Sequence, residues 1–342
     1  STWQVSHAPI TAATFNGVRP ASPLVTVENG GEYSERMVRV RIPAEVAEDE
    51  FAMGFYYDAA TGAIEGLPLV AADSRSVTVA TRHFSSIFVG AIKTAVLDHL
   101  VTTGEIDSRF RPGVDDWQFT NFGSYIEPGG HCAGQALSAL WYFITRPDGA
   151  NASLYGRYDR NGATPATPGI WQDDNLGYRF ASMVQQRIDW NSKVNMLAYE
   201  LAGAADAAKF RAFAYAMHVT GEPQEVAIFS DSGGHDMIVY RIKDNALYIA
   251  DPNYPGATDR RIEFDPARGR FRPYNSGANA AEIAAGNGES YDTIAYSAKT
   301  ATIDWRVIAT LWNDFRERRI GVGVFPSYQL LWKGTGDDLK PI

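Results

Sequence analysis

The sequence predicts an α+β protein, in which an all-β sandwich is followed by a larger domain with helices first and antiparallel strands later. Short runs of strand-forming residues, divided by turn residues, fill the first 90 positions. Helical spacing of apolar residues then dominates up to Gly221, and strand-forming runs return after it. The length of 342 residues suits two domains. We therefore expect a β-sandwich accessory domain at 1–90 and an α+β domain at 91–342.

The first domain is predicted from regularly spaced strand signals. Turn residues at 29–31, 58–62 and 72–74 separate the runs, a spacing typical of a sandwich. The runs lie at 24–27, 37–42, 52–57 and 77–81. The stretch 76–88 resembles the last strand of β-sandwich modules in bacterial surface and secreted proteins. That resemblance implies an extracellular or cell-surface location and a role as adaptor, spacer or lid.

The second domain is predicted from helical and strand patterns in turn. Gly221 is a typical stop for the helix before it, and residues 276–290 are rich in small and polar residues, which predicts a surface loop. The expected helices span 91–100, 133–144, 176–189, 194–218 and 304–318, and further strands are expected at 291–302 and 325–332.

Cys132 is the only cysteine, and it lies in a glycine-rich turn at 128–134. An apolar stripe of helical period follows at Ala133, Ala136, Leu137, Leu140, Trp141 and Ile144. Pro147 ends that pattern. The thiol is therefore expected at the first turn of a buried helix, where free amides stabilise a thiolate and can hold an oxyanion. The neighbouring His131 is expected at the rim.

The other candidate catalytic residues lie in a predicted hairpin. His235 begins the first strand and Asp251 ends the second, with a polar step at 243–245 between them. A three-residue loop puts His235 opposite Asn253, with Asp251 diagonal to it on the same face. A two-residue loop at 244–245 puts His235 and Asp251 on opposite faces. A catalytic pair of His235 and Asp251 therefore requires the three-residue loop. Asn253 remains an alternative orienting residue.

These residue types fit nucleophilic catalysis by a thiol. A thiol becomes a good nucleophile when it is paired with an imidazolium at a helix start. The histidine returns its proton to the leaving group, and a carboxylate on its far nitrogen fixes tautomer and orientation. The order of cysteine, histidine and aspartate gives Cys132, His235 and Asp251 these roles.

With these motifs the chain resembles the papain-like cysteine peptidase superfamily, and bacteriocin-processing and related bacterial peptidases in particular. The resemblance covers about residues 115–255 and rests on 130–134, 234–235 and 251–252. It implies a papain-like α+β domain with Cys132 as nucleophile, His235 as base and Asp251 as orienter. Such enzymes carry a glutamine before the cysteine as oxyanion donor. Here that place holds Ile126 and Glu127, so Asn121 is the candidate donor, with Gln118 the other nearby amide.

Composition excludes several other functions. A net charge of −9 argues against a nucleic-acid partner, and no apolar run is long enough to span a membrane. One cysteine and six scattered histidines provide neither a disulfide nor a typical zinc site. We therefore expect no cofactor and no metal, and we expect a protein or peptide as substrate. Further domains in the native chain are also expected.

Three functions stay open from the sequence. The first is peptide hydrolysis through an acyl-enzyme on Cys132. The second is a transglutaminase-like acyl transferase or a deamidase that uses the same triad. The third is a non-catalytic module for binding or adhesion, in which Cys132 is a buried structural thiol. Five aromatic residues are candidates for lining a substrate groove: Trp117, Tyr125, Trp171, Tyr254 and Tyr274.

Overall fold

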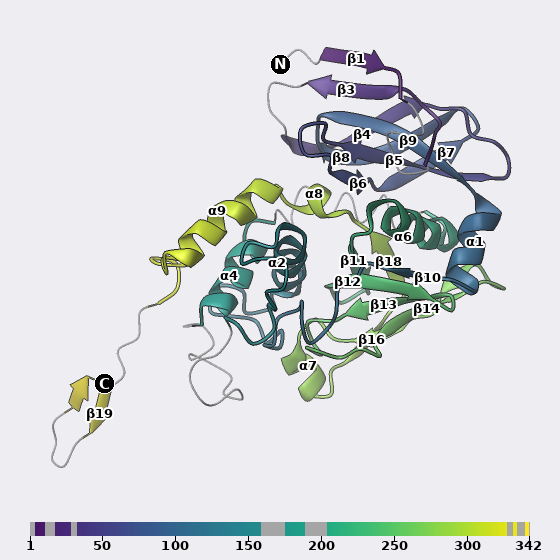
Figure 1. The fold of residues 1–342 in the computed structure, drawn as a ribbon. Coiled ribbons are helices and arrows are strands. Elements are labelled where there is room, and N and C mark those ends of the chain that lie inside the picture. The colour runs from purple at the N-terminus through teal and green to yellow at the C-terminus, as the bar shows by residue number, and fades with distance from the viewer. Residues whose placement is uncertain are drawn as a thin grey trace.

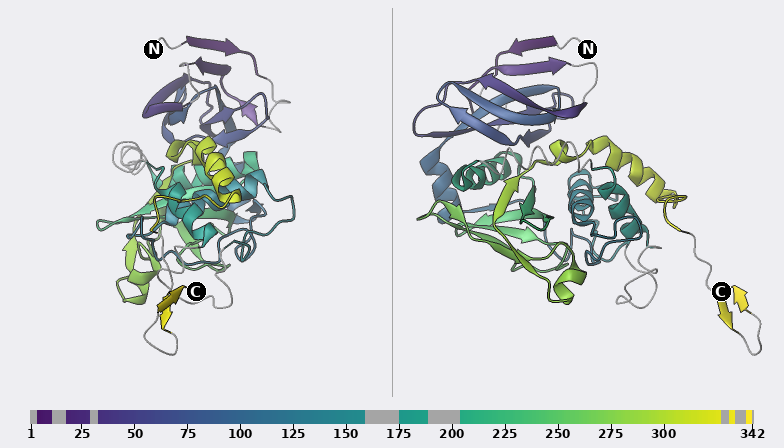
Figure 2. Two further views of the ribbon diagram at one scale, coloured as in Figure 1. Left: turned by 90° about the vertical axis from the view of Figure 1, so that its left-hand side faces the viewer. Right: turned by 180° about the vertical axis from the view of Figure 1, so that it is seen from behind.

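The structure is a computed structural model that describes residues 4–10, 18–28, 33–158, 175–188, 204–326, 331–333 and 339–341. It is a mixed α+β protein, as the sequence predicts. A two-sheet β-sandwich lies at one end of the molecule, and a second sheet with helices on both faces lies below it (Figure 1; Figure 2). In the described part of the chain, no helix is long and apolar enough to cross a membrane.

The first β unit pairs two antiparallel sheets. One has the order β1-β3-β9-β5-β6 with β2 beside β9, and the other has the order β4-β8-β7. The strands are β1 (Gln4–Ala8), β2 (Arg19–Pro20), β3 (Leu24–Glu28), β4 (Tyr33–Pro43), β5 (Glu50–Tyr57), β6 (Ile64–Gly66), β7 (Leu69–Asp73), β8 (Ser76–His83) and β9 (Ser86–Lys93). The four strand runs expected here are therefore confirmed.

The expected boundary at residue 90 falls inside a strand. β9 pairs with β5 along its whole length, from Tyr57↔Ser86 to Glu50↔Lys93. The connecting helix α1 therefore begins later than the expected 91–100 and covers Thr94–Thr102. The reason is that β9 stays hydrogen-bonded to β5 and almost wholly buried through Ala91, so that the sheet overrides a local helical pattern.

The second sheet has the order β15-β14-β13-β12-β11-β18, with β10 beside β12. Its strands are β10 (Glu105–Asp107), β11 (Gln224–Phe229), β12 (Gly234–Lys243), β13 (Ala246–Ala250), β14 (Arg261–Asp265), β15 (Arg270–Phe271) and β18 (Thr293–Tyr296). Helix α6 (Asp206–Thr220) packs on the face that looks toward the sandwich, and α2 (Cys132–Thr145) packs on the other side (Figure 1). The sheet is thus buried on both faces.

Local sequence signals were sufficient to predict the positions of several other helices. α4 (Leu176–Gln185) and α9 (Trp305–Arg316) lie where expected, and the Asp304 side chain caps α9. Gly221 has φ +67 and ends α6, as expected of a glycine stop. Part of the helix expected at 194–218 lies outside the described residues.

Two later expectations are wrong in detail. The stretch 276–290 is not only a surface loop, because it holds α7 (Ala280–Ala284) between the paired strands β16 (Tyr274–Ser276) and β17 (Glu289–Tyr291). The strand expected at 291–302 breaks after β18 and continues as α8 (Lys299–Thr302). Of the strand expected at 325–332, residues 327–330 lie outside the described part, and 331–332 belong to β19 (Leu331–Lys333), which pairs with β20 (Leu339–Pro341).

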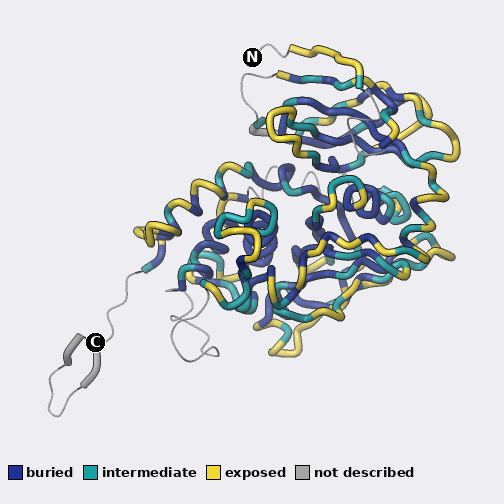
Figure 3. The backbone as a smooth tube through the Cα atoms, viewed as in Figure 1, coloured by how far each residue is buried: buried dark blue, intermediate teal, exposed yellow. Residues whose placement is uncertain are grey.

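One apolar core joins the sandwich to the second domain. Met53, Phe55 and Phe88 on the outer face of the sandwich pack with Phe213 and Tyr215 of α6. Figure 3 shows buried residues both along the central sandwich strands and along α6. The sandwich and the second domain therefore bury apolar side chains against each other.

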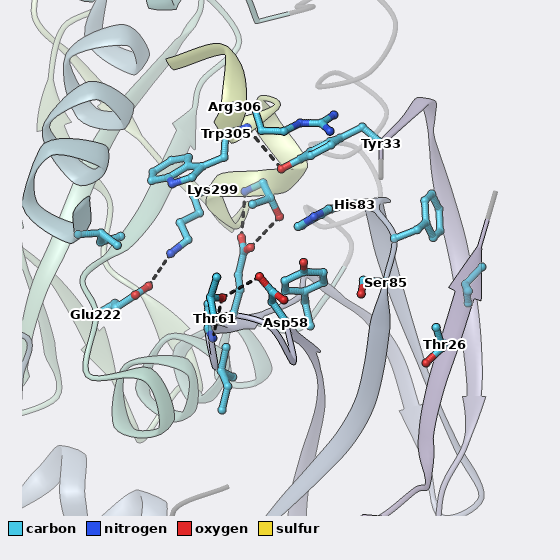
Figure 4. Close-up of a pocket in the computed structure, with 18 of the residues that line it drawn as sticks. Thr26, Tyr33, Asp58, Thr61, His83, Ser85, Glu222, Lys299, Trp305 and Arg306 are labelled. Carbon is cyan, nitrogen blue, oxygen red and sulfur yellow. Dashed lines mark hydrogen bonds and ion pairs between the residues drawn. The ribbon is translucent and has the colours of Figure 1, made fainter. Parts of the chain in front are cut away.

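A cavity of about 750 Å³ opens at the seam between the domains (Figure 4). Three of its charged groups have partners: Lys299 pairs with Glu222, and Glu65 accepts from the amide and hydroxyl of Thr300. Ile144 and Thr145 line it, so it lies at the opposite end of α2 from Cys132, about 20 Å away. This cavity is therefore separate from the thiol site.

Candidate functional site

The structure places Cys132 at the first position of α2, as the apolar stripe predicts. Gly130 reaches the helix with φ +118, a conformation that side chains rarely adopt, whereas Gly129 is not left-handed. The Asn121 side chain accepts a hydrogen bond from the amide of His131 at 2.7 Å and so fixes this turn. Cys132 is buried, with 7% of its surface exposed.

The hairpin brings His235 and Asp251 to one face by a route that the sequence analysis did not anticipate. The loop has two residues, because Lys243 pairs with Ala246 and both Asp244 and Asn245 have positive φ. The expected three-residue loop is therefore wrong.

A β-bulge corrects the register along the strand. The pairing shifts by one residue between Val239 and Arg241, so that Ile238 pairs with Ala250. Continuing that pairing places His235 opposite Asn253, with Asp251 diagonal to it. The bulge at Tyr240 thus brings His235 and Asp251 to the same face, as the three-residue loop was expected to do.

His235 and Asp251 form a buried hydrogen-bonded pair. The distance from His235 Nε2 to Asp251 Oδ1 is 2.7 Å, and both side chains have no exposed surface. His235 Nδ1 is buried, and no hydrogen bond to it meets the distance limit among the described residues, although the Cys132 side chain is near enough to interact with the imidazole. Burial alone would lower the pKa of His235, but the Asp251 carboxylate and the nearby Cys132 side chain raise it to about 10. The imidazole is therefore protonated at neutral pH, and its Nε2–H points to Asp251.

Asp251 is held as a carboxylate despite its burial. Burial would raise its pKa, but the His235 imidazolium and neighbouring hydrogen-bond donors lower it below the ordinary value. The amide of Asn253 donates to Oδ1 at 2.8 Å. Asn253, the alternative orienting residue, bonds through its own side chain to Ser276 and to the Gly277 carbonyl. Asp251 is thus the residue that contacts the imidazole.

Asn121 lies beside the site, but its contacts do not suit an oxyanion donor. Its Nδ2 group donates to Asn253 Oδ1 at 3.1 Å and to the Ala278 carbonyl at 3.0 Å, so both N–H bonds are committed. Its oxygen accepts from His131. Asn121 therefore ties the turn before Cys132 to the strand side of the site. In the described chain, no hydrogen bond engages the amide of Cys132, which leaves this backbone donor available.

His131 was expected at the rim of the site, and this expectation is wrong. Its side chain is fully buried, and its ring packs on Phe119 and Tyr178. Burial lowers its pKa to about 3, so this imidazole is neutral. His131 therefore belongs to the core between α2 and α4.

The aromatic groove candidates separate into different roles. Trp117 is buried and donates to Ser138 on α2, whereas Tyr125 is 62% exposed near the turn before Cys132. Trp171 lies outside the described residues. Tyr254 packs against Arg260, and the hydroxyl of Tyr274 donates to Asp251 at 2.7 Å. Of these five, Tyr274 is the one that contacts the His–Asp pair.

Two buried groups near the site were not identified from the sequence. Tyr291 pairs across the strands with Tyr274, and its buried hydroxyl interacts with Glu289 on the same strand. Asp236 follows His235 on the other face of β12, and burial raises its pKa to about 7. An ordinary strand pattern surrounds both residues, so nothing in the sequence distinguishes them as site residues.

The described side chains contain no cluster able to hold a metal ion. No protein-family model matches the chain, and neither a curated protein nor a solved structure shows significant similarity to it. The site combines a thiol at a helix start with a buried His235–Asp251 pair, and Cys132 is close enough to interact with His235. Such an arrangement can activate a nucleophile and deliver a proton to a leaving group.

Proposed function

We propose that this protein is a thiol-dependent peptidase with a papain-like second domain. The observation that carries the proposal is the 2.7 Å hydrogen bond from His235 Nε2 to Asp251, which leaves Nδ1 for the thiol of Cys132. The order of the three residues and the helix that begins at Cys132 support it. The substrate is then a peptide or protein with an amide bond accessible to the start of α2.

The proposed reaction has two halves, acylation of Cys132 and hydrolysis of the acyl-enzyme, and each of the three residues acts in both. Cys132 Sγ attacks the carbonyl carbon, and the bond to the leaving nitrogen breaks as His235 gives that nitrogen its proton. Water then attacks the thioester and passes a proton to His235, and the S–C bond breaks to release the acid. Asp251 stabilises the imidazolium and keeps its orientation throughout.

Of Asn121 and the Cys132 amide, we expect the Cys132 amide to hold the oxyanion, because the N–H groups of Asn121 are committed elsewhere. Loss of one oxyanion donor typically costs about 100- to 1000-fold in rate. We therefore expect turnover slower by about that factor than in a thiol peptidase with a second donor.

Product analysis tests the proposed function. The full chain and a Cys132→Ala variant are incubated with a peptide library, with and without an added primary amine, and new termini are identified by mass spectrometry. We expect new termini only with Cys132 present, and an acyl adduct on the Cys132 peptide after acid quenching. Tyr215→Phe is a matched control, since that buried hydroxyl lies in the other core and has no hydrogen-bond partner within the described part of the chain.

Other outcomes separate the alternatives. Amine-capped products would show an acyl transferase, and conversion of glutamine to glutamate would show a deamidase. Identical products from the full chain and from Cys132→Ala would contradict the peptidase and favour a binding module.

A further inference from the structure

The carboxylate of Asp251 is surrounded by donors from four directions. Oδ1 accepts from His235 and from the amide of Asn253, while Oδ2 accepts from the hydroxyls of Tyr274 at 2.7 Å and Ser276 at 3.3 Å. Both oxygens are therefore acceptors, which leaves no place for a proton on the carboxyl group.

Arg260 determines the direction of these bonds. Its Nε donates to the Tyr274 oxygen at 2.7 Å, and its NH2 group donates to the Asn275 carbonyl at 2.7 Å. A guanidinium only donates, so the Tyr274 oxygen must accept from it and its own proton is directed to Asp251. The hydrogen bonds therefore run in one direction, from Arg260 to Tyr274 and from Tyr274 to Asp251. We call this series of hydrogen bonds the relay.

Packing holds Arg260 in this geometry. Its guanidinium carbon lies 4.1 Å from the ring centre of Tyr254 and 4.7 Å from that of Tyr274. The guanidinium is also 3.9 Å from Asp251 Oδ2. Arg260 comes from the segment between β13 and β14, and Tyr274 comes from β16, so two elements outside the hairpin converge on one carboxylate.

We propose that Arg260 and Tyr274 are positioning residues of the thiol site, which hold Asp251 charged and oriented so that His235 presents Nδ1 to Cys132. This inference rests on the proposed function, since it assigns these residues a part in activating the same thiol. A hydrogen bond polarised by a cation is a stronger donor to the next acceptor, so the relay acts beyond simple packing.

The proposal predicts a change in the pH dependence of Cys132 reactivity. The fall in reactivity on the acid side (the acid limb) should occur at a higher pH when the relay is broken. The Tyr274 hydrogen bond is among those that lower the pKa of Asp251, so its removal raises that pKa. The carboxyl then becomes protonated at a higher pH, and His235 loses its partner there. The other titratable groups that interact with the pair are Cys132 on α2 and Tyr291 on β17, while Asp236 acts on His235 from the opposite face of β12.

The test is the rate of Cys132 alkylation by iodoacetamide from pH 4 to 9. The full chain is compared with Tyr274→Phe and Arg260→Gln, and Tyr215→Phe and Arg261→Gln serve as matched controls. Arg261 is an exposed neighbour paired with Glu263. We expect both relay variants to slow labelling at pH 6 by about 10-fold and to move the acid limb to higher pH. Both controls should stay within about twofold of the full chain.

A His235→Ala arm separates the two proposals. If labelling of the full chain depends on His235 but neither relay variant moves the limb, the relay is overturned and the proposed function stands. If labelling does not depend on His235, the proposed function and the relay fail together. Circular dichroism verifies folding, and Tyr274→Phe retains the ring, so a folding defect in Arg260→Gln alone would not decide the outcome.

Discussion

At the scale of single residues, the site depends on charges that stay buried because they are paired. His235 and Asp251 have no exposed surface, so each ion needs the other. The pairing raises the pKa of His235 to about 10 from its ordinary value of 6.5. A histidine whose folded pKa is raised stabilises the fold fully below its unfolded pKa, and the stabilisation disappears as pH rises through the folded pKa.

Stability is therefore expected to fall between about pH 6.5 and pH 10 through this pair. Urea unfolding of the full chain and of His235→Gln at several pH values measures it, because the difference between the two profiles isolates His235. We expect the difference to shrink steadily above pH 6.5. Parallel profiles over this range would show that the pair does not titrate as described.

At the scale of elements, the turn before Cys132 and the hairpin bulge place the reacting groups. The apolar stripe after Cys132 was sufficient to predict the helix, because the 3.6-residue period is a local signal. The bulge at Tyr240 could not be predicted, because it depends on how β12 packs between β13, β11 and β10. His235 and Asp251 were identified correctly as neighbours, although the reason was wrong.

The two glycines before His131 should differ in their tolerance of substitution. Gly130→Ala is expected to cost about 1–3 kcal/mol of unfolding free energy, because φ is +118 and a Cβ would lie 3.2 Å from Asn121 Oδ1 and the Ala278 carbonyl. Gly129→Ala meets no atom within 4 Å and should stay within about 0.5 kcal/mol. Chemical unfolding and Cys132 labelling measure both variants. Equal effects at the two positions would contradict the geometry of this turn.

At the scale of the whole molecule, the sandwich and the second sheet with its helices share one apolar core. The Tyr296 hydroxyl donates across the seam to the Gly66 carbonyl at 2.8 Å, and Glu65 accepts from Thr300. The sequence predicted two domains from composition and pattern, but it carried no sign of the shared core, because contacts between distant segments leave no local period.

A single unfolding transition is therefore expected for the full chain. Every tryptophan except Trp3 follows residue 94, so tryptophan fluorescence reports mainly on the second domain, while circular dichroism reports on both. The two probes should give coincident thermal transitions. Tyr296→Phe should lower stability by about 1–3 kcal/mol, since it leaves the acceptor on Gly66 without its donor. Two separated transitions would instead indicate independent domains.

The central claim is that His235 activates Cys132, and alkylation of the single cysteine at pH 6 tests it most directly. The rate with iodoacetamide is measured for the full chain and for His235→Ala. The account predicts rapid labelling of the full chain and a loss of about 10-fold or more in the variant, because the imidazolium that stabilises the thiolate is gone. Equal and slow labelling of both proteins would contradict an activated thiol.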